Sequence, residues 1–336
     1  MILIISNDNE PTTDSVIDWL LHLKADFVRI NSEDVVNKGL RLSKSINKDM
    51  LVIGDQEIDM NAVNVAWYRR WYSYNGIGIR PINAHQRQLF REMCSEAEEF
   101  LFYIYNILKD RKWLSNPLVN KTHSKLYAIH LAHRMGIKVP QSFITNQTPE
   151  VIGFVERHKD VITKPMGDPY VYFEPDGTNY KNFTQRLSAG FLKKLKPAIF
   201  TSLFQEMIKA ECEIRTFYLD GEFYSTALVN STTVDIKLSV KRDENLRMIS
   251  YDLPECIKEK IRLLMHKLNL NTGSIDIIRD SKGGHYFLEV NPIGQFAGYG
   301  YASNYQLEKK VAEWLIINDV KKIAHNERNA IYERVC

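Results

Sequence analysis

The sequence contains no long hydrophobic run. None of the apolar stretches in its 336 residues approaches the roughly 20 residues that a membrane-spanning helix needs. The first residues, MILIISNDNE, form a short apolar run followed at once by acidic residues, which is the pattern of a first β-strand and not of a signal peptide. We therefore expect no membrane contact and a location in the cytoplasm.

Cysteine is scarce, and neither sign of charge dominates. The four cysteines lie far apart and form no CxxC pair, so neither a zinc site nor a disulfide framework is indicated, and a reducing compartment fits this usage. The net charge of +3 is small for this length, whereas a dedicated nucleic-acid binder carries a dense basic stripe. We therefore expect no nucleic-acid partner.

The remaining composition, 44% hydrophobic and 25% charged, is that of a globular protein, and the length suits two or three domains. Residues 1–112 alternate strand and helix patterns, ending in an amphipathic helix from about His85 to Lys109, and predict an α/β domain. The phrase WLSNP then ends this helix. Residues 113–198 and 199–336 predict two α+β segments.

Three short stretches add detail to this outline. The segment NVAWYRRWY predicts a strand of the first domain that carries Arg69 and Arg70 on alternating faces. Residues 168–182 are polar, aromatic and rich in turn formers, so we expect a mobile loop or a loose hairpin there. A β-hairpin is also predicted, with its turn at Asp220-Gly221, because Asp-Gly is a strong hairpin signal.

A second hairpin, GSIDIIRDSKGGHYFLEVN, carries polar residues inside apolar strands. If SKGG is a four-residue loop, Asp280 faces His285 and Asp276 lies opposite Glu289. A two-residue Gly-Gly loop would instead place Asp276 opposite Asn291. Either even loop puts the two carboxylates and the amide on one face, whereas an odd loop would scatter them.

Two carboxylates and an amide oxygen on one face would repel each other unless a cation joined them. Hard oxygen ligands in this number suit Mg²⁺, which completes its shell with water and phosphate oxygens. An alternative is that Asp276 and Glu289 are simply the solvent face of an antiparallel sheet.

Basic residues upstream weaken that alternative. Lys125 begins a helix and Lys164 ends an apolar strand, while Arg215 shares a strand face with Glu213. Each alone fits an exposed surface residue. Together, cations aimed at phosphates opposite carboxylates that hold Mg²⁺ are what phosphoryl transfer requires.

The order of these motifs resembles the ATP-grasp carboxylate ligases. Lys125 before GIKVP is followed by ITKP, FQEMIKAECEIR, GSIDII and FLEVNP, and the resemblance covers nearly the whole chain. The segments MILIISNDNEPTTDSVIDWL, WYRRW, TVDIK and NYQLEKKVAEWL make the sequence most similar to the graspetide synthetases and grasp-with-spasm peptide maturases. The resemblance implies an ATP-grasp fold, in which an N-terminal pre-ATP-grasp domain precedes two α+β lobes that enclose ATP.

The resemblance also implies how ATP is bound. Lys125 and Lys164 would contact its phosphates. Glu206 and Ile208, in the QEMI hinge, would meet the adenine edge, mostly through backbone groups. Glu213 would accept hydrogen bonds from the ribose hydroxyls.

The same resemblance implies the catalytic and metal residues. Arg215 would stabilise charge on the transferring phosphoryl group, and Asp276, Glu289 and Asn291 would hold Mg²⁺. The sequence departs from the pattern in two places. The segment GDPYVYFEPDG at 167–177 stands where relatives often have a Gly-rich flap, and Lys237 stands where relatives usually carry arginine. The candidate contacts to an acidic substrate are Arg69, Arg70, Lys237, Lys241, Arg242 and Arg247.

The implied function is ATP-dependent activation of Glu or Asp side chains in a ribosomal precursor peptide, joined to Ser or Thr hydroxyls (ω-ester) or Lys amines (ω-amide) as macrocycles. Two alternatives stay open: a ligase that adds an amino acid such as glutamate to a protein or small carboxylate, and a non-catalytic ATP-grasp-like scaffold. Relatives of this kind are often homodimers, so we expect one here.

Overall fold

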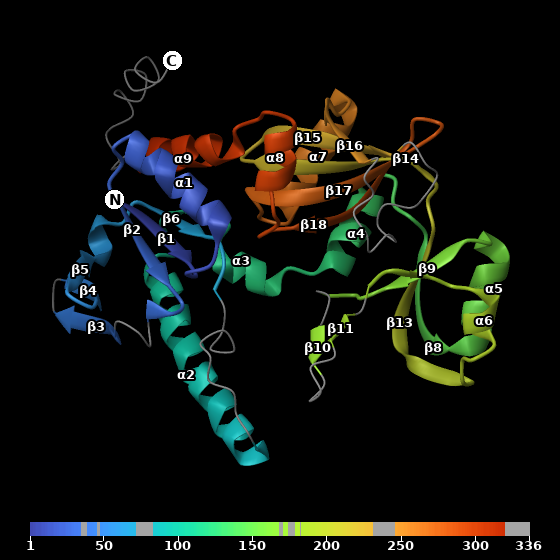
Figure 1. Cartoon of the computed structure of the whole chain (residues 1–336), viewed down its shortest axis with the longest axis horizontal. Helices are drawn as coiled ribbons and strands as arrows, with labels where there is room; N and C mark the ends of the chain where they lie inside the picture. Colours follow the sequence, from blue (N-terminus) through green and yellow to red (C-terminus); the bar gives the residue numbers. More distant parts are fainter. Residues whose placement is uncertain are drawn as a thin grey trace. The chain divides into compact units, whose positions relative to one another are not determined.

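The computed structural model in Figure 1 divides into two compact units, each formed by its own contacts. The first unit comprises Met1–Thr122 together with Gln306–Cys336, and the second comprises His123–Tyr305. The structure describes residues 1–34, 39–45, 48–71, 83–167, 171–173, 179–181, 183–230 and 246–319.

A parallel sheet of four strands, in the order β2-β1-β6-β7, forms the centre of the first unit. Its middle strand β1 is buried along its whole length, as expected for a strand covered on both faces, and this accounts for the continuous apolar run near the start of the chain. The alternation of strand and helix predicted for the start of the chain is confirmed. The strands are β1 (Ile2–Ser6), β2 (Phe27–Asn31), β6 (Val65–Tyr68) and β7 (Lys112–Leu114).

The predicted strand through Arg69 and Arg70 is shorter than expected. β6 ends at Tyr68, and both arginines follow it. The neighbouring strand β1 ends at Ser6, and the Arg69 amide still donates to the Ile5 carbonyl at 2.9 Å. β1 extends only one residue beyond its last pair with β6, Ile5 with Tyr68, so the ladder between the two strands ends here.

Helices and a small antiparallel sheet surround this parallel sheet. Leu3 and Ile5 of β1 pack in one core with Ile104 and Leu108, at the end of the predicted long helix. The last described helix of the chain lies beside the first, as Figure 1 shows in red and blue. The elements are α1 (Pro11–His22), β3 (Leu40–Ser45), β4 (Lys48–Ile53), β5 (Gln56–Asp59), η2 (Met60–Ala62), α2 (Ala84–Ile107), α3 (Pro117–Thr122) and α9 (Leu307–Asn318).

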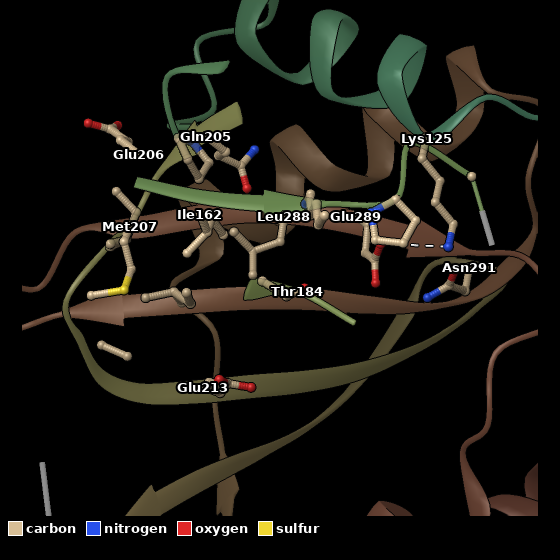
Figure 2. Close-up of a pocket in the computed structure, with 17 residues that line it drawn as sticks. Lys125, Ile162, Thr184, Gln205, Glu206, Met207, Glu213, Leu288, Glu289 and Asn291 are labelled. Atoms are coloured by element: carbon tan, nitrogen blue, oxygen red, sulfur yellow. Dashed lines mark ion pairs between the residues drawn. The ribbon is translucent and has the colours of Figure 1, made fainter. Parts of the chain in front are cut away.

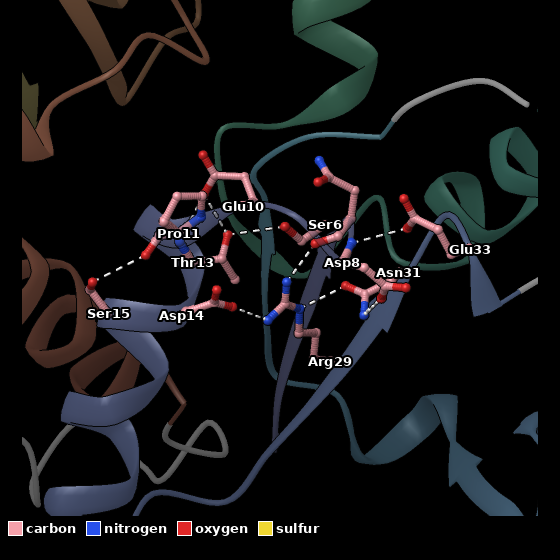
Figure 3. Close-up of polar contacts among 11 residues, drawn as sticks. Ser6, Asp8, Glu10, Pro11, Thr13, Asp14, Ser15, Arg29, Asn31 and Glu33 are labelled. Atoms are coloured by element: carbon pink, nitrogen blue, oxygen red, sulfur yellow. Dashed lines mark hydrogen bonds and ion pairs between the residues drawn. The ribbon is translucent and has the colours of Figure 1, made fainter. Parts of the chain in front are cut away.

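Arg29 of β2 ties the end of the parallel sheet to the first helix (Figure 3). Its Nη1 lies 2.5 Å from the Asp14 carboxylate of α1, and its Nη2 donates to the Asn7 carbonyl at 2.5 Å. Its Nε donates to the Asn31 side chain at 2.7 Å. One guanidinium thus joins β2, the residue after β1, and α1.

The second unit contains two larger sheets. One has the order β12-β9-β13-β8, and the other has the order β16-β15-β14-β17-β18. The strands of the first are β8 (Ser142–Gln147), β9 (Val161–Lys164), β12 (Gln185–Arg186) and β13 (Ala198–Glu206). Those of the second are β14 (Ala210–Leu219), β15 (Glu222–Asn230), β16 (Leu246–Tyr251), β17 (Thr272–Asp280) and β18 (His285–Asn291).

The segment expected as a loop or loose hairpin contains β10 (Val171–Phe173) and β11 (Asn179–Lys181), which pair antiparallel. Among the described residues, every helix is too short or too polar to cross a membrane. The helices of this unit are α4 (Lys125–Arg134), α5 (Thr148–His158), α6 (Ala189–Leu192), α7 (Glu255–Lys267) and α8 (Ala297–Ala302).

The hairpin predicted around Asp220-Gly221 is confirmed by the pairing of β14 with β15. Both turn residues have positive φ, 45° and 107°, as a two-residue turn of the type favoured in hairpins requires.

The hairpin of β17 and β18 has a different loop from the one predicted. Arg279, and not Asp280, lies opposite His285, and the Asp280 amide donates to the Gly284 carbonyl at 2.9 Å. The loop therefore has an odd number of residues. Gly283, at φ +79°, takes the left-handed position that closes such a loop.

A β-bulge corrects the register further along this hairpin. The pairing shifts by one residue between Ile277 and Asp276, and Leu288 is the extra residue on β18. Asp276 consequently lies opposite Glu289, the pairing expected for a four-residue loop, although the loop is odd. Phe287 and Leu288 are both buried, which a regular half-exposed strand would not allow for consecutive residues.

Candidate active site

The second unit contains a cavity of about 340 Å³ between its two sheets. This volume falls within the range of small-molecule sites. Seven of the nine residues predicted to bind ATP, act in catalysis or hold metal line it: Lys125, Lys164, Glu206, Ile208, Glu213, Glu289 and Asn291.

The cavity has an apolar end and a polar end (Figure 2). Ile162, Met207 and Leu288 lie at one end, where they can cover the faces of a flat ring. Lys125 and Asn291 lie at the other end. A ligand with an aromatic head and an anionic tail matches this division.

The Glu206 carboxylate is held by the protein at the hinge. It accepts from the Gln141 backbone amide at 2.8 Å and lies 3.5 Å from Nδ1 of His158, and in Figure 2 it points away from the other labelled side chains. The Glu206 amide donates to the Gln141 carbonyl, and the Met207 amide to the Asp160 carbonyl, both at 2.9 Å. This arrangement fits a residue that would meet a ligand through its backbone.

Arg215 lies between two carboxylates on one sheet face. Its Nη2 is 3.0 Å from Glu213 on the same strand, and its Nη1 contacts Asp276, which lies directly opposite on β17. Burial by itself would lower the pKa of Arg215, but these two carboxylates raise it above its ordinary value. The guanidinium therefore stays charged, with its centre 5.9 Å from the Tyr299 ring.

Arg215 and Asp276 do not line the cavity wall. They adjoin it through their neighbours: Glu213 is two residues from Arg215 on β14, and Glu289 is paired with Asp276 across the hairpin. Five of the predicted residues, Glu213, Arg215, Asp276, Glu289 and Asn291, thus share one face of the five-stranded sheet, with part in the cavity and part behind it.

Lys125 faces the carboxylates from α4. Ser124 caps this helix by accepting from the Tyr127 amide at 3.3 Å, which fixes Lys125 in the first turn. The Lys125 Nζ lies 3.7 Å from Oε2 of Glu289. His123, just before the helix, contacts the Val290 carbonyl of β18 at 3.1 Å through its ring nitrogen.

The oxygen donors suit a magnesium ion. Asp276 and Glu289 are directly paired, and Asn291 follows on the same face. Among the described residues, no group of three or more His, Cys, Asp or Glu side chains could hold a metal alone. A metal here would therefore use two carboxylates and an amide, with water and ligand phosphate oxygens completing the shell that Mg²⁺ prefers.

The candidate substrate contacts are spread over the chain. Arg69 is buried and lies 3.4 Å from Glu10, while the Nε of Arg70 is 3.9 Å from the same carboxylate. Arg247 is exposed on β16. The other three candidates, Lys237 in the segment TVDIK, Lys241 and Arg242, lie outside the described residues.

Sequence reasoning missed the apolar wall and the residues that hold the hinge. Ile162, Ile278 and Leu288 carry no chemical signal, because apolar strand residues have the same pattern in a core. His158 lies 48 residues before Glu206 (206 − 158), so no local spacing joins them. The bulge could have been suspected from the consecutive apolar pair Phe287-Leu288.

No family model and no curated protein sequence matches this chain. Solved structures do. The macrocyclase MdnC, bound with precursor peptide MdnA, from Microcystis aeruginosa MRC, is 20% identical with a TM-score of 0.80, covering 95% of this chain and 100% of that one. A Chryseobacterium gregarium RiPP-associated ATP-grasp ligase, in complex with ADP and a leader and core peptide, is 20% identical with a TM-score of 0.78, covering 96% and 99%.

The ATP-grasp ligase PsnB, complexed with minimal precursor, Mg and ADP, is 17% identical with a TM-score of 0.74, covering 95% of this chain and 97% of that one. The chain therefore has the ATP-grasp fold, and the fold predicted from its motifs is confirmed.

Proposed function

We propose that this protein is an ATP-dependent carboxylate ligase of the graspetide synthetase type. It activates Glu or Asp side chains of a ribosomal precursor peptide and joins them to Ser or Thr hydroxyls or to Lys amines, forming macrocycles. The observation that carries the proposal is one cavity with an apolar end for a flat base and, at its other end, Lys125 beside Glu289 and Asn291. The similarity of the fold to a macrocyclase bound with a precursor peptide, and to a RiPP-associated ATP-grasp ligase bound with a leader and core peptide, supports the choice of substrate.

The chemistry follows from the weakness of a carboxylate as an electrophile. A peptide carboxylate oxygen attacks the γ-phosphorus of ATP, the bond to the β-phosphate oxygen breaks, and ADP leaves. A hydroxyl or amine then attacks the acyl carbon, inorganic phosphate leaves, and the nucleophile releases its proton. The net change in the peptide is loss of one water for each link, and the enzyme acts mainly by positioning and charge stabilisation.

The residues divide this work by position. Lys125 and Lys164 bind the phosphates, Glu213 accepts from the ribose, and the backbone of Glu206 and Ile208 meets the base. Arg215 stabilises charge on the transferring phosphoryl group. Mg²⁺ held by Asp276, Glu289 and Asn291 would neutralise the phosphate oxygens.

Intact-mass measurement tests the proposal. A candidate precursor, encoded beside this gene and rich in acidic residues, is incubated with the protein and Mg-ATP. We expect a loss of one water per link, and alkaline hydrolysis then separates esters from amides. Glu289→Gln should abolish the change, while Glu57→Gln, an exposed carboxylate in the first unit, should not.

Other outcomes would identify the alternatives. A gain of an amino-acid mass would indicate a ligase that adds an amino acid to a carboxylate. ATP left unconsumed with every peptide and amino acid would indicate a binding scaffold.

We also propose that the protein is a cytoplasmic homodimer. The resemblance to peptide maturases supports the dimer, and the scattered cysteines support the reducing compartment. Light scattering after size-exclusion chromatography should give twice the mass of one chain, and a monomer mass would contradict the proposal.

A further inference from the structure

Each of the two carboxylates suited to Mg²⁺ already has a cation beside it. Lys125 Nζ lies 3.7 Å from Glu289 Oε2, and Arg215 Nη1 contacts the Asp276 carboxylate. The four side chains are largely buried, with 17% and 22% of the first pair exposed and 20% and 8% of the second. The Lys125–Glu289 pair is therefore close to neutral when the site holds no ligand, whereas Arg215 shares its charge between Asp276 and Glu213.

A divalent cation entering this site competes with those cations for the same oxygens. Ion pairs at partly buried positions are screened less than those in water, so a metal must displace a real interaction. The metal also gains less electrostatic attraction, because Lys125 already compensates the charge of Glu289 and Arg215 part of the charge of Asp276. Metal binding to the free protein should consequently be weak.

The two cations differ in their freedom to move. Arg215 is held between Asp276 and Glu213 on the sheet and does not line the cavity wall. Lys125 lines the cavity, is borne on a flexible four-carbon stem, and is paired at a longer distance. A phosphate chain in the cavity can attract Lys125, whereas Arg215 stays with Asp276.

We propose that Lys125 is an exchangeable counter-ion of the metal site. In the free protein it neutralises Glu289, and when nucleotide binds it moves to the phosphates and leaves Glu289 to the metal. The nucleotide thereby creates the metal site, and binding of the two is positively coupled. This inference rests on the proposed function and adds a binding order to it.

Manganese binding without nucleotide or peptide tests the exchange, with free Mn²⁺ followed by electron paramagnetic resonance. The wild-type protein should bind Mn²⁺ weakly, and Lys125→Met should bind it at least about fivefold more tightly, the lower end of typical coupling between sites. Lys125→Arg keeps the charge and should stay as weak as wild type. Adding Glu289→Gln to Lys125→Met should abolish the gain.

Lys164→Met is the matched control, because it removes a positive charge from the same cavity on β9. A gain confined to Lys125→Met supports the exchange. Equal gains in both variants would overturn it in favour of a general field effect, as would tight Mn²⁺ binding by the wild type. Thermal unfolding of each variant verifies that it is folded.

The exchange and the proposed function fail in different ways. An unchanged Mn²⁺ affinity in Lys125→Met would refute the exchange. The proposed function would still be tested separately by water loss from the precursor. If no form of the protein bound manganese, even with ADP added, the proposed metal site itself would be refuted.

Discussion

Two arginines organise polar networks in this molecule, and they use different partners. Arg29, in the first unit, bonds to a carbonyl, an amide and one carboxylate, Asp14, which is 55% exposed. Arg215, in the second unit, contacts two carboxylates, Glu213 and Asp276, that are 5% and 8% exposed. The first network has one exposed carboxylate for its guanidinium, whereas the second has two buried carboxylates for one guanidinium.

This difference indicates what each network is for. Mixed neutral partners suit an arginine that only holds segments together, because few charges are removed from water. Two buried carboxylates around one guanidinium are costly for stability alone, and their place next to a cavity favours a role in charge chemistry. Substitutions in the two units can break or sharpen this contrast.

The largest effect is expected for Arg215→Met. It leaves Glu213 and Asp276 buried without their shared counter-ion, so we expect a loss of about 3–5 kcal/mol in the free energy of unfolding. Urea denaturation measures this, alongside water loss from the precursor, which should disappear. A loss below about 1 kcal/mol would contradict the importance given to this network.

Gly294→Ala should lower the free energy of unfolding by about 2 kcal/mol, within the range for an overpacked site. A Cβ at Gly294 would overlap the Ser274 side chain, which lies on β17 opposite Asn291, so the turn after β18 must move. Gly298→Ala, where a Cβ meets nothing within 4 Å, is the matched control and should be neutral or slightly stabilising. Equal unfolding energies for the two variants would refute the close approach.

Arg29→Met should cost about 1.5 kcal/mol of unfolding free energy, as expected for hydrogen bonds from a charged group that is partly exposed. Its network has no member among the cavity residues, so the affinity for ADP, measured by calorimetry, should not change. A weakened ADP affinity in this variant would erase the contrast between the two arginines.

The smallest effect concerns Glu10, a buried carboxylate of the first unit. Burial would raise the pKa of Glu10, but Arg69 and the hydrogen bonds from Thr13 outweigh it, and the pKa lies below the ordinary 4.5. The ionised form therefore adds stability above pH 4.5, and this is lost as the pH falls through the folded-state pKa. Unfolding followed from pH 6 to 3 should have a shallower slope in Glu10→Gln, and identical slopes would contradict the shift.

Much of the architecture could be predicted because it depends on local patterns and on motif order. The pairing of Asp276 with Glu289 was expected for a four-residue loop. The loop itself was predicted wrongly, and the pairing is still correct because the odd loop and the bulge at Leu288 offset each other. β6 was predicted too long because a strand also depends on where its partner ends.

The site was predictable where residues carry charged or polar groups and not where shape decides. Glu289 and Asn291 stand out in an apolar strand, and Lys125 was predicted from its place in the order of the motifs. The apolar wall does not stand out, and neither does the direction of the Glu206 side chain, which is set by Gln141 and His158 from distant parts of the chain.

The bulge at Leu288 also determines how the hairpin can change in length. Removing Leu288 would delete the bulge, leave the loop closed by Gly283 untouched, and keep Asp276 opposite Glu289, while opening a gap in the apolar wall of the cavity. Removing a loop residue would instead disturb the turn. In an alignment, a chain one residue shorter in this hairpin should therefore have its gap at position 288 and not in the loop.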